Sequence, residues 1–126
     1  MKRFFPALLF LCLLAACGGG SEEKKETKVV DITQDPNYQK GLQLEVANDC
    51  KTCHLIDARV TGPSFREIAD KYAGYPDTIV SHLADKVISG GMGVWGESIP
   101  MLAHSGLKKE DAEAIVRYIL LLKTKK

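Results

Sequence analysis

Apolar residues recur three and four positions apart in four segments of the chain between residues 36 and 126. This spacing is typical of amphipathic helices, which bury one face and expose the other. The first segment starts at Pro36, because proline suits the first turn of a helix, and ends near Cys50. No run alternates with period two, so the sequence predicts no strand. We therefore expect an all-α domain of about four short helices.

The three later segments carry start and stop signals for helices. The second covers residues 64–72, between a proline and a glycine. The third follows Asp77, a favourable N-cap, and ends at the glycine pair 90–91. The fourth covers residues 112–122, with acidic residues before it and lysines after it, which complements the helix dipole. Residues 90–106 are rich in glycine and are expected to form a loop.

Residues 1–16 have the order of a secretory signal peptide. Two basic residues come first, an apolar stretch follows, and small residues precede Cys17. The stretch is too short to cross a membrane, which takes roughly 20 apolar residues. The sequence Leu-Ala-Ala-Cys that ends at Cys17 resembles the lipobox of bacterial lipoproteins, in which the cysteine receives a diacylglycerol and becomes the first residue. The alternative is an ordinary signal peptide that is cut nearby.

Residues 17–35 combine glycines and charges with only three bulky apolar groups, Val29, Val30 and Ile32, which cannot bury a core. We expect this segment to be a lipidated, flexible tether with a reach on the order of 20–25 Å. Residues 36–126 then form the folded domain, on the periplasmic side of a bacterial membrane to which the lipid anchors it.

Charge and composition exclude several classes of protein. With 26% charged and 45% hydrophobic residues, the chain is neither disordered throughout nor fibrous. Loss of residues 1–16 would remove two of the 17 basic residues and none of the 16 acidic ones, so the mature chain is nearly neutral. A nucleic-acid partner is therefore not expected. A helical domain of about 90 residues often needs a disulfide, a metal or a cofactor to complete its core.

The candidate chemistry lies in the sequence Cys50-Lys-Thr-Cys53-His54, which has the C-x-x-C-H spacing of c-type haem attachment. Two thiols one helical turn apart can each add to a vinyl group of one porphyrin, and the adjacent imidazole then lies over the iron. Cys12 leaves with the signal peptide and Cys17 takes lipid, so no cysteine is left over.

Three other uses of Cys50 and Cys53 are weaker. A thioredoxin-like redox pair would be accompanied by strands in a βαβ unit. A zinc site would need two further ligands, and His82 and His104 are isolated in the sequence. A disulfide between the two cysteines would close a very small loop and stabilise little.

The sixth coordination position of a haem iron separates electron carriers from sensors and catalysts. The candidates in the chain are Met92, Met101, His82 and His104. Met101 is favoured because it follows Pro100 in the loop before the last helix, whereas Met92 lies between two glycines. The alternative for Met101 is a methionine that fills the core.

Several spaced motifs together resemble the small bacterial class I monohaem cytochromes c. They are the sequence 50–54, Thr-Gly-Pro-Ser-Phe at 61–65, Gly-Val-Trp-Gly at 93–96 and Ile-Pro-Met at 99–101, all ahead of a C-terminal helix. The resemblance covers roughly residues 38–122. It implies a cytochrome c fold of helices wrapped around one covalently attached haem.

The resemblance also implies roles for individual residues. His54 and Met101 would be the two axial ligands of the haem iron. The carbonyl of Pro63 would accept a hydrogen bond from the His54 ring, and Trp95 would lie beside a haem propionate. Gly41 and Tyr118 would meet where the first and last helices cross, because glycine allows close approach.

The chain departs from the family pattern after Met101, where a second proline is often found and where this sequence has Leu102 and Ala103. One extra residue lies between Trp95 and Met101. We hypothesise that His104 hydrogen-bonds the methionine sulfur and makes the reduction potential depend on pH as it titrates. The alternative is a surface histidine in a loop.

If protein side chains fill both axial positions, one-electron exchange is the remaining chemistry. We therefore expect a one-electron carrier in a respiratory or other periplasmic electron-transfer chain and not an enzyme. It would be a monomer that meets membrane-bound or periplasmic redox proteins through small interfaces. The alternatives are a haem-based sensor or peroxidase-like protein with a displaceable sixth ligand, and a tethered helical adaptor without haem.

Overall fold

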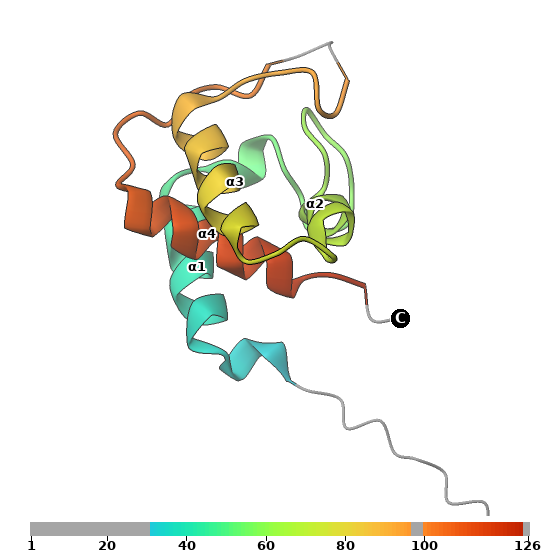
Figure 1. The fold of residues 1–126 in the computed structure, drawn as a ribbon, viewed down its shortest axis with the longest axis vertical. Coiled ribbons are helices and arrows are strands. Elements are labelled where there is room, and N and C mark those ends of the chain that lie inside the picture. Colours follow the sequence, from blue (N-terminus) through green and yellow to red (C-terminus); the bar gives the residue numbers. More distant parts are fainter. Residues whose placement is uncertain (1–30, 97–99, 125–126) are drawn as a thin grey trace, which may run out of the picture.

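The computed structural model describes residues 31–96 and 100–124. The elements in chain order are η1 (Ile32–Gln34), α1 (Pro36–Ala47), η2 (Cys50–Thr52), α2 (Phe65–Tyr72), α3 (Thr78–Ser89) and α4 (Lys109–Leu121), of which η1 and η2 are single 3₁₀ turns (Figure 1). Within these residues, extended pairing is limited to two isolated bridges. The predicted all-α fold with four short helices is confirmed.

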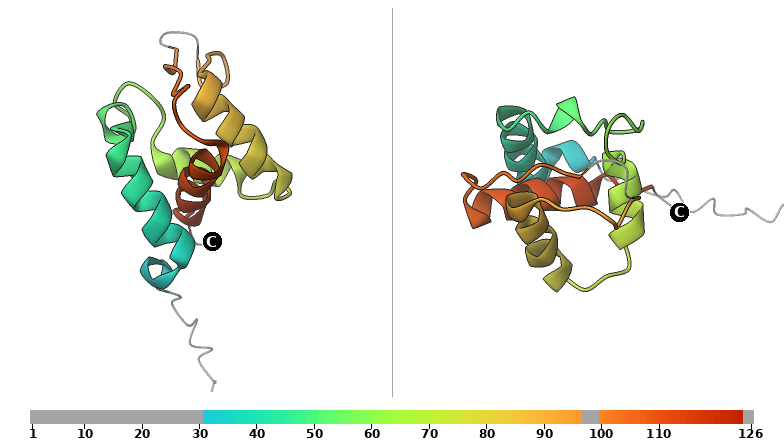
Figure 2. Two further views of the ribbon diagram at one scale, coloured as in Figure 1. Left: turned by 90° about the vertical axis from the view of Figure 1, so that its left-hand side faces the viewer. Right: turned by 90° about the horizontal axis from the view of Figure 1, so that it is seen from above.

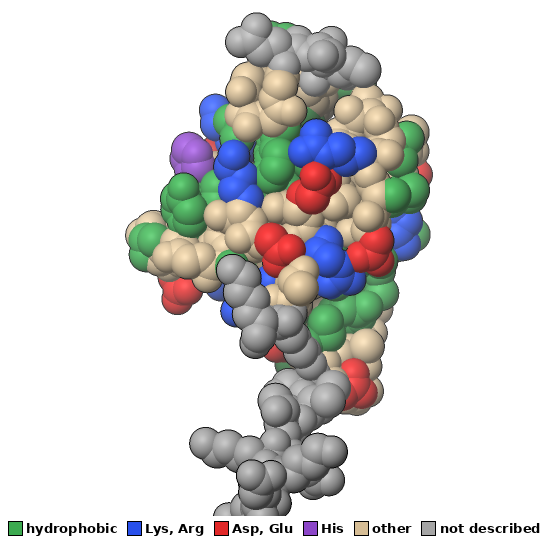
Figure 3. Space-filling model, turned by 90° about the vertical axis from the view of Figure 1, so that its right-hand side faces the viewer, with side chains coloured by type: hydrophobic (Ala, Val, Ile, Leu, Met, Phe, Trp, Pro, Cys, Tyr) green, Lys and Arg blue, Asp and Glu red, His purple; other side chains and the backbone are tan. Residues whose placement is uncertain are grey.

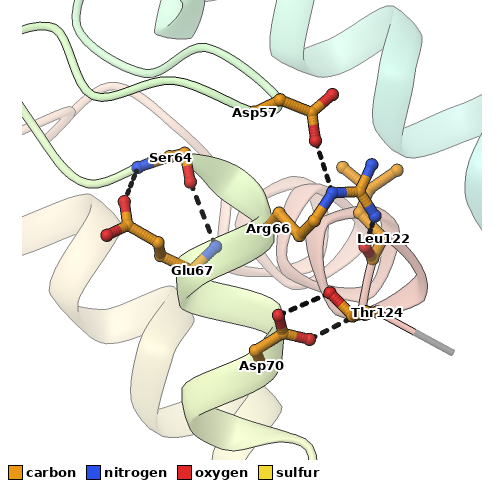
Figure 4. Close-up of polar contacts among 7 residues, drawn as sticks. All are labelled: Asp57, Ser64, Arg66, Glu67, Asp70, Leu122 and Thr124. Atoms are coloured by element: carbon orange, nitrogen blue, oxygen red, sulfur yellow. Dashed lines mark hydrogen bonds and ion pairs between the residues drawn. The ribbon is translucent and has the colours of Figure 1, made fainter. Parts of the chain in front are cut away.

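The local sequence explains where two of the helices start. The Asp35 carboxylate accepts a hydrogen bond from the backbone N–H of Asn37 at 2.8 Å, and Pro36 occupies the first turn of α1. At the start of α2, the Glu67 N–H donates to Ser64 Oγ at 3.1 Å, and the Ser64 N–H donates to Glu67 Oε2 at 2.8 Å (Figure 4). This reciprocal capping box satisfies two backbone donors that the helix itself leaves free.

The predicted N-cap position of Asp77 is confirmed, but its side chain does not cap the helix. Asp77 does occupy the N-cap position of α3, but its side chain makes no capping hydrogen bond and its backbone is already helical, with φ −58° and ψ −20°. A capping side chain reaches the first backbone donors from an extended N-cap residue. The N–H of Val80 donates to the Asp77 carbonyl at 3.1 Å instead.

Helix α4 lies at the centre of the fold and packs against α1, α2 and α3 (Figures 1 and 2). Two clusters of buried side chains flank it. The first joins α4 to α1 and α2 and includes Phe65, Ala69, Ile115, Tyr118, Ile119 and Leu122. The second joins α4 to α3 and includes Val80, Ala84, Ala112 and Val116. The helices are therefore held through α4 as a common support.

The crossing of α1 and α4 depends on Gly41. A Cβ atom at Gly41 would lie 2.2 Å from Tyr118 Cβ and 2.4 Å from the Ala114 carbonyl oxygen, which is closer than packed atoms can approach. Tyr38 packs edge-on against Tyr118, with 5.2 Å between the ring centroids. The contact between Gly41 and Tyr118 that the family resemblance implied is present.

Polar contacts tie α2 to the end of α4 (Figure 4). Arg66 forms an ion pair with Asp57 in the preceding loop and donates from Nη1 to the Leu122 carbonyl oxygen at 2.5 Å. Asp70 accepts hydrogen bonds from Thr124, from the backbone N–H at 2.6 Å and from the hydroxyl at 2.7 Å. These contacts satisfy backbone groups at a helix terminus and hold the loop before α2 in place.

The folded part begins earlier than the sequence suggested. Residues 31–35, assigned to the tether, contain η1, which Asp31 caps by accepting from the N–H of Thr33 at 3.0 Å. Ile32 packs against the cluster between α1 and α4. Cys17 and the expected signal peptide lie outside the described residues. Within the described parts of the chain, no helix is long and apolar enough to cross a membrane.

Replacing Gly41 by alanine is expected to lower the free energy of unfolding by at least about 2 kcal/mol, because α1 and α4 must separate to admit the Cβ atom. Urea unfolding of the haem-loaded protein measures the change. Gly74→Ala is the matched control, since a Cβ atom there meets nothing within 4 Å, and it should stay within about 0.5 kcal/mol of wild type. Equal midpoints for the two variants would contradict the close crossing.

Candidate functional site

Cys50, Cys53 and His54 lie on the turn that follows α1. Asp49 adopts the left-handed conformation, with φ 55° and ψ 28°, and this turns the chain into η2. The N–H groups of Cys53 and His54 both donate to the Cys50 carbonyl, at 3.1 and 2.9 Å. The two cysteines are therefore one turn apart, and both are free and half-buried.

The Cys50 thiol is held in its protonated form. Burial, with a further contribution from the negative charge of Glu45, raises the pKa of this thiol to about 11. Redox-active and metal-binding cysteines need a lowered pKa, because the thiolate is the reactive species. In the described part of the chain, no three His, Cys, Asp or Glu side chains gather as a metal site. The structure thus gives no support to the thioredoxin-like and zinc alternatives.

The His54 ring is fixed in position and in tautomer. Its Nδ1 lies 2.7 Å from the Pro63 carbonyl oxygen. A carbonyl oxygen only accepts, so Nδ1 carries the hydrogen and Nε2 keeps a lone pair for a metal ion. Phe65 stacks on the imidazole, with 5.6 Å between centroids and 16° between ring planes. The hydrogen bond to Pro63 that the family resemblance implied is present.

The loop from residue 55 to residue 63 wraps the histidine. The Gly62 N–H donates to the Cys53 carbonyl at 2.9 Å, and the Phe65 N–H donates to the Leu55 carbonyl at 2.9 Å. A Cβ atom at Gly62 would lie 2.4 Å from Cε1 of the imidazole. Only glycine fits there without moving the ring. The sequence alone assigns no role to Gly62 and Phe65, although both lie in the Thr-Gly-Pro-Ser-Phe motif that follows His54.

The two candidate methionines differ in how the backbone holds them. Met101 pairs with Gly91 in a short antiparallel bridge, in which Met101 N–H donates to Gly91 at 2.8 Å and Gly91 N–H donates to Met101 at 3.1 Å. Gly90 has φ +69°, and a Cβ atom there would lie 2.5 Å from the Met101 carbonyl oxygen. The Met101 side chain is half-buried, whereas Met92 is 60% exposed. Residue 99 lies outside the described residues.

Trp95 is half-buried and has two cations against its ring. The Lys71 ammonium lies 4.6 Å from the ring centroid and the Arg59 guanidinium lies 5.9 Å from it. Arg59 also pairs with Glu67 at 2.7 Å. On the face shown in Figure 3, basic and acidic side chains are interspersed. Arg59 and Lys71 lie far from Trp95 in the chain, so no local sequence signal marks them as its neighbours.

The two remaining histidines lie apart from His54. His82 is exposed on α3. His104 is half-buried, and its Nδ1 lies 3.2 Å from the Leu102 carbonyl oxygen, so this nitrogen is the donor. Its backbone N–H donates to the Val87 carbonyl at 3.2 Å, which attaches the loop to α3. The proposed effect of His104 on the reduction potential stays a prediction.

These features fit a covalently attached haem. They are two thiols on one turn, an imidazole with a free Nε2, and the glycine at 62 that leaves room for that ring. The family model described as "Cytochrome c" matches residues 38–123. The chain belongs to the cytochrome c family. Membership implies one c-type haem with its iron, covalently attached, and electron transfer as the activity.

Relatives and solved structures agree with this assignment. The chain is 39% identical to cytochrome c-552 of Nitrosomonas europaea over 85 residues, which cover 68% of this chain and 81% of that protein. It is 37% identical to cytochrome c-551 of Azotobacter vinelandii, over 65% of this chain and 96% of the relative. The crystal structure of wild-type Nitrosomonas europaea cytochrome c552 superposes with a TM-score of 0.60, covering 65% of this chain and 99% of that one at 39% identity. The fold is that of the small class I cytochromes c.

Replacing Gly62 by alanine is expected to weaken the bond between His54 and the haem iron, because the added methyl group displaces the ring from the Pro63 carbonyl. Groups that orient a metal ligand typically contribute roughly 10–100-fold to affinity, so the pH at which acid releases the imidazole should rise by roughly one to two units. Acid titration of the visible spectrum measures this pH. Gly106→Ala, where a Cβ atom meets nothing within 4 Å, is the control. An unchanged acid midpoint in Gly62→Ala would show that the close contact of Gly62 with the His54 ring does not position the ring.

Proposed function

We propose that this protein carries single electrons in a respiratory or other periplasmic electron-transfer chain, with His54 and Met101 as the axial ligands of its haem iron. Cys50 and Cys53 form the thioether links. When bound, the haem supplies the reversible one-electron chemistry of iron. The observation that carries the proposal is the fixed tautomer of His54, whose Nε2 is free for the metal while Nδ1 donates to Pro63.

Met101 is the better candidate for the second axial position. The bridge to Gly91 uses both the N–H and the carbonyl of Met101, so little backbone entropy remains to be lost when the thioether binds. Met92 has its side chain largely in solvent. A thioether ligand raises the reduction potential and closes the iron to small molecules, as an electron carrier requires.

Trp95 and its cations are proposed to face a haem propionate. An indole N–H donates hydrogen bonds, and Lys71 and Arg59 make its surroundings electropositive. A buried or half-buried carboxylate needs such partners.

The partners are proposed to be membrane-bound or periplasmic redox proteins. Apolar side chains are exposed on the loops next to the haem-binding residues, namely Leu55, Val60, Met92, Val94 and Leu102. Exposed apolar groups near a functional site favour protein contacts. Electron-transfer complexes use small and transient interfaces of this kind.

Met101→Ala is expected to abolish the far-red ferric absorption band that arises from iron–sulfur bonding, to lower the reduction potential, and to let carbon monoxide bind the ferrous protein. Met92→Ala is the matched control and should leave all three properties unchanged. The opposite result, with the band lost only in Met92→Ala, would reassign the ligand. Prompt binding of carbon monoxide or peroxide by the wild-type protein would favour a sensor or peroxidase-like function instead.

We further propose that the protein is exported and anchored by lipid on Cys17, with residues 18–30 as the tether. The support is the Leu-Ala-Ala-Cys sequence behind an apolar stretch. Several acyl chains on one residue hold a protein firmly at a membrane surface.

Cys17→Ser is expected to move most of the haem-loaded protein from the membrane fraction to the soluble periplasmic fraction, because the acceptor of the lipid is lost. Haem absorbance in the two fractions measures the distribution. Cys12→Ser, in the apolar stretch before the lipobox, is the control and should remain with the membrane. A Cys17→Ser protein that still sediments with membranes would argue against lipid at this residue.

A further inference from the structure

Glu45 is a charged residue in the core of the fold. It lies on α1 at the crossing with α4, and its side chain is 0% exposed. The other buried polar residue in the described chain, Ser64, takes part in the capping box of α2. Within the described residues, neither carboxylate oxygen of Glu45 accepts a hydrogen bond. A fully buried carboxylate without hydrogen bonds is rare, because its charged form loses the hydration that water provided.

One cation faces Glu45. The Lys51 Nζ atom lies 3.5 Å from Glu45 Oε2, and the Lys51 side chain is 48% exposed. Lys51 belongs to η2 and stands between Cys50 and Cys53, the two residues that hold the haem. The carboxylate is thus buried on one side and paired, at the edge of the core, with a cation that water still reaches.

The other groups near Glu45 are the neutral Tyr118, which Tyr38 in turn contacts, and the first cysteine. From α4, Tyr118 has a buried hydroxyl with no hydrogen-bond partner among the described residues, and burial together with the charge of Glu45 raises the pKa of Tyr118 to about 12. From α1, Tyr38 packs against Tyr118. From η2, Cys50 lies near enough to Glu45 and Asp49 for their negative charges to raise its pKa. Cys50 has no ionisable thiol once it is bonded to haem, so Lys51 is the main charged partner.

Two opposing effects act on the Glu45 carboxyl. Burial is the larger effect and raises the pKa of this carboxyl, whereas the charge of Lys51 and its polar contact with the carboxylate lower it. Because these effects oppose each other, a further charge nearby can decide which form prevails. The haem iron supplies such a change, since its charge falls by one when it is reduced.

Glu45 is electrically close to the haem-binding residues. Its charge already influences the sulfur of Cys50. The Tyr118 ring packs edge-on against Phe65 at 6.3 Å, and Phe65 stacks on His54. Water and salt screen buried charges less than exposed ones, and the Glu45 side chain is fully buried.

We propose that Glu45 binds one proton when the protein accepts one electron and releases that proton on oxidation. This inference rests on the proposed function as a haem electron carrier. One electron passes from the donor protein to the iron, which goes from Fe(III) to Fe(II), and one proton from water bonds to a Glu45 oxygen. Oxidation by the acceptor protein reverses both transfers. The protein then takes up one proton together with each electron and releases both on oxidation.

The sign of the coupling follows from charge. The oxidised iron has one more positive charge and favours the Glu45 carboxylate, whereas reduction favours the neutral acid. The reduction potential should therefore fall as pH rises, over a range that begins above the pH at which an exposed glutamate titrates. The slope cannot exceed a tenfold change in the equilibrium constant per pH unit, about 59 mV for a one-electron couple.

The test is a series of spectroelectrochemical titrations of the full, haem-loaded protein at different pH values. Glu45→Gln, which is close in shape but cannot titrate, should remove this part of the pH dependence. Glu110→Gln is the matched control, because it removes the same charge from an exposed glutamate on α4 and should keep the wild-type slope. Lys51→Gln should shift the sloping range to higher pH, since it removes the cation that stabilises the carboxylate.

Infrared difference spectroscopy between the oxidised and reduced protein is a second readout. Reduction should produce a carboxylic acid C=O band in wild type that Glu45→Gln lacks. If that variant does not mature, the wild-type band and the Lys51→Gln shift carry the test. The proposal would be overturned if Glu45→Gln kept the wild-type slope of reduction potential against pH, or if only His104→Ala lost that slope. It would also be overturned if the wild-type protein lacked the carboxylic acid band. A reversible but pH-independent potential refutes only the role of Glu45, whereas no reversible potential at all refutes electron carriage.

Discussion

The close crossing of α1 and α4 at Gly41 is the contact on which the rest of the fold depends. No side chain separates the two helices there, and α4 packs against α2 and α3 as well. The end of α1 then delivers Cys50 and Cys53 to one side of the molecule, and the end of α3 delivers the loop with Met101. A chain this small can bury only a small apolar core, and packing three helices against one central helix places distant ligands with few buried residues.

The environment of His54 is built from the same support. Arg66 and Asp70 fasten α2 to the end of α4, and the start of α2 places Pro63 and Phe65 against the imidazole. The ring is thus oriented by a hydrogen bond, by a stacked aromatic ring and by the lack of a side chain at Gly62. A ligand oriented before the metal binds loses little freedom on binding, which strengthens its bond to the iron.

Helices, the cysteine motif and the His54–Pro63 contact could be predicted because each depends on residues close in sequence or on a family motif. Contacts between distant segments, such as Lys71 with Trp95, could not. The apolar stripe along α1 is only partly buried, since Tyr38, Leu42 and Leu44 pack against the core but Val46 does not. The structure leaves Val46 54% exposed and buries Gly41 and Glu45, one turn apart. Because a glycine and a charged residue lie on the inner face of α1, the pattern of apolar residues does not identify that face.

Glu45 is hard to explain by stability alone. Buried ion pairs contribute little net stability, and replacing one by apolar side chains of similar volume is often neutral or stabilising by about 1–4 kcal/mol. An apolar side chain there would remove a buried carboxylate whose one polar contact among the described residues is the 3.5 Å ion pair with Lys51. A carboxyl with one half-exposed cation beside it is, in contrast, poised between two protonation states. A titratable core residue that lowers stability, on the helix that leads into the turn with Cys50, fits the proposed coupling between proton and electron.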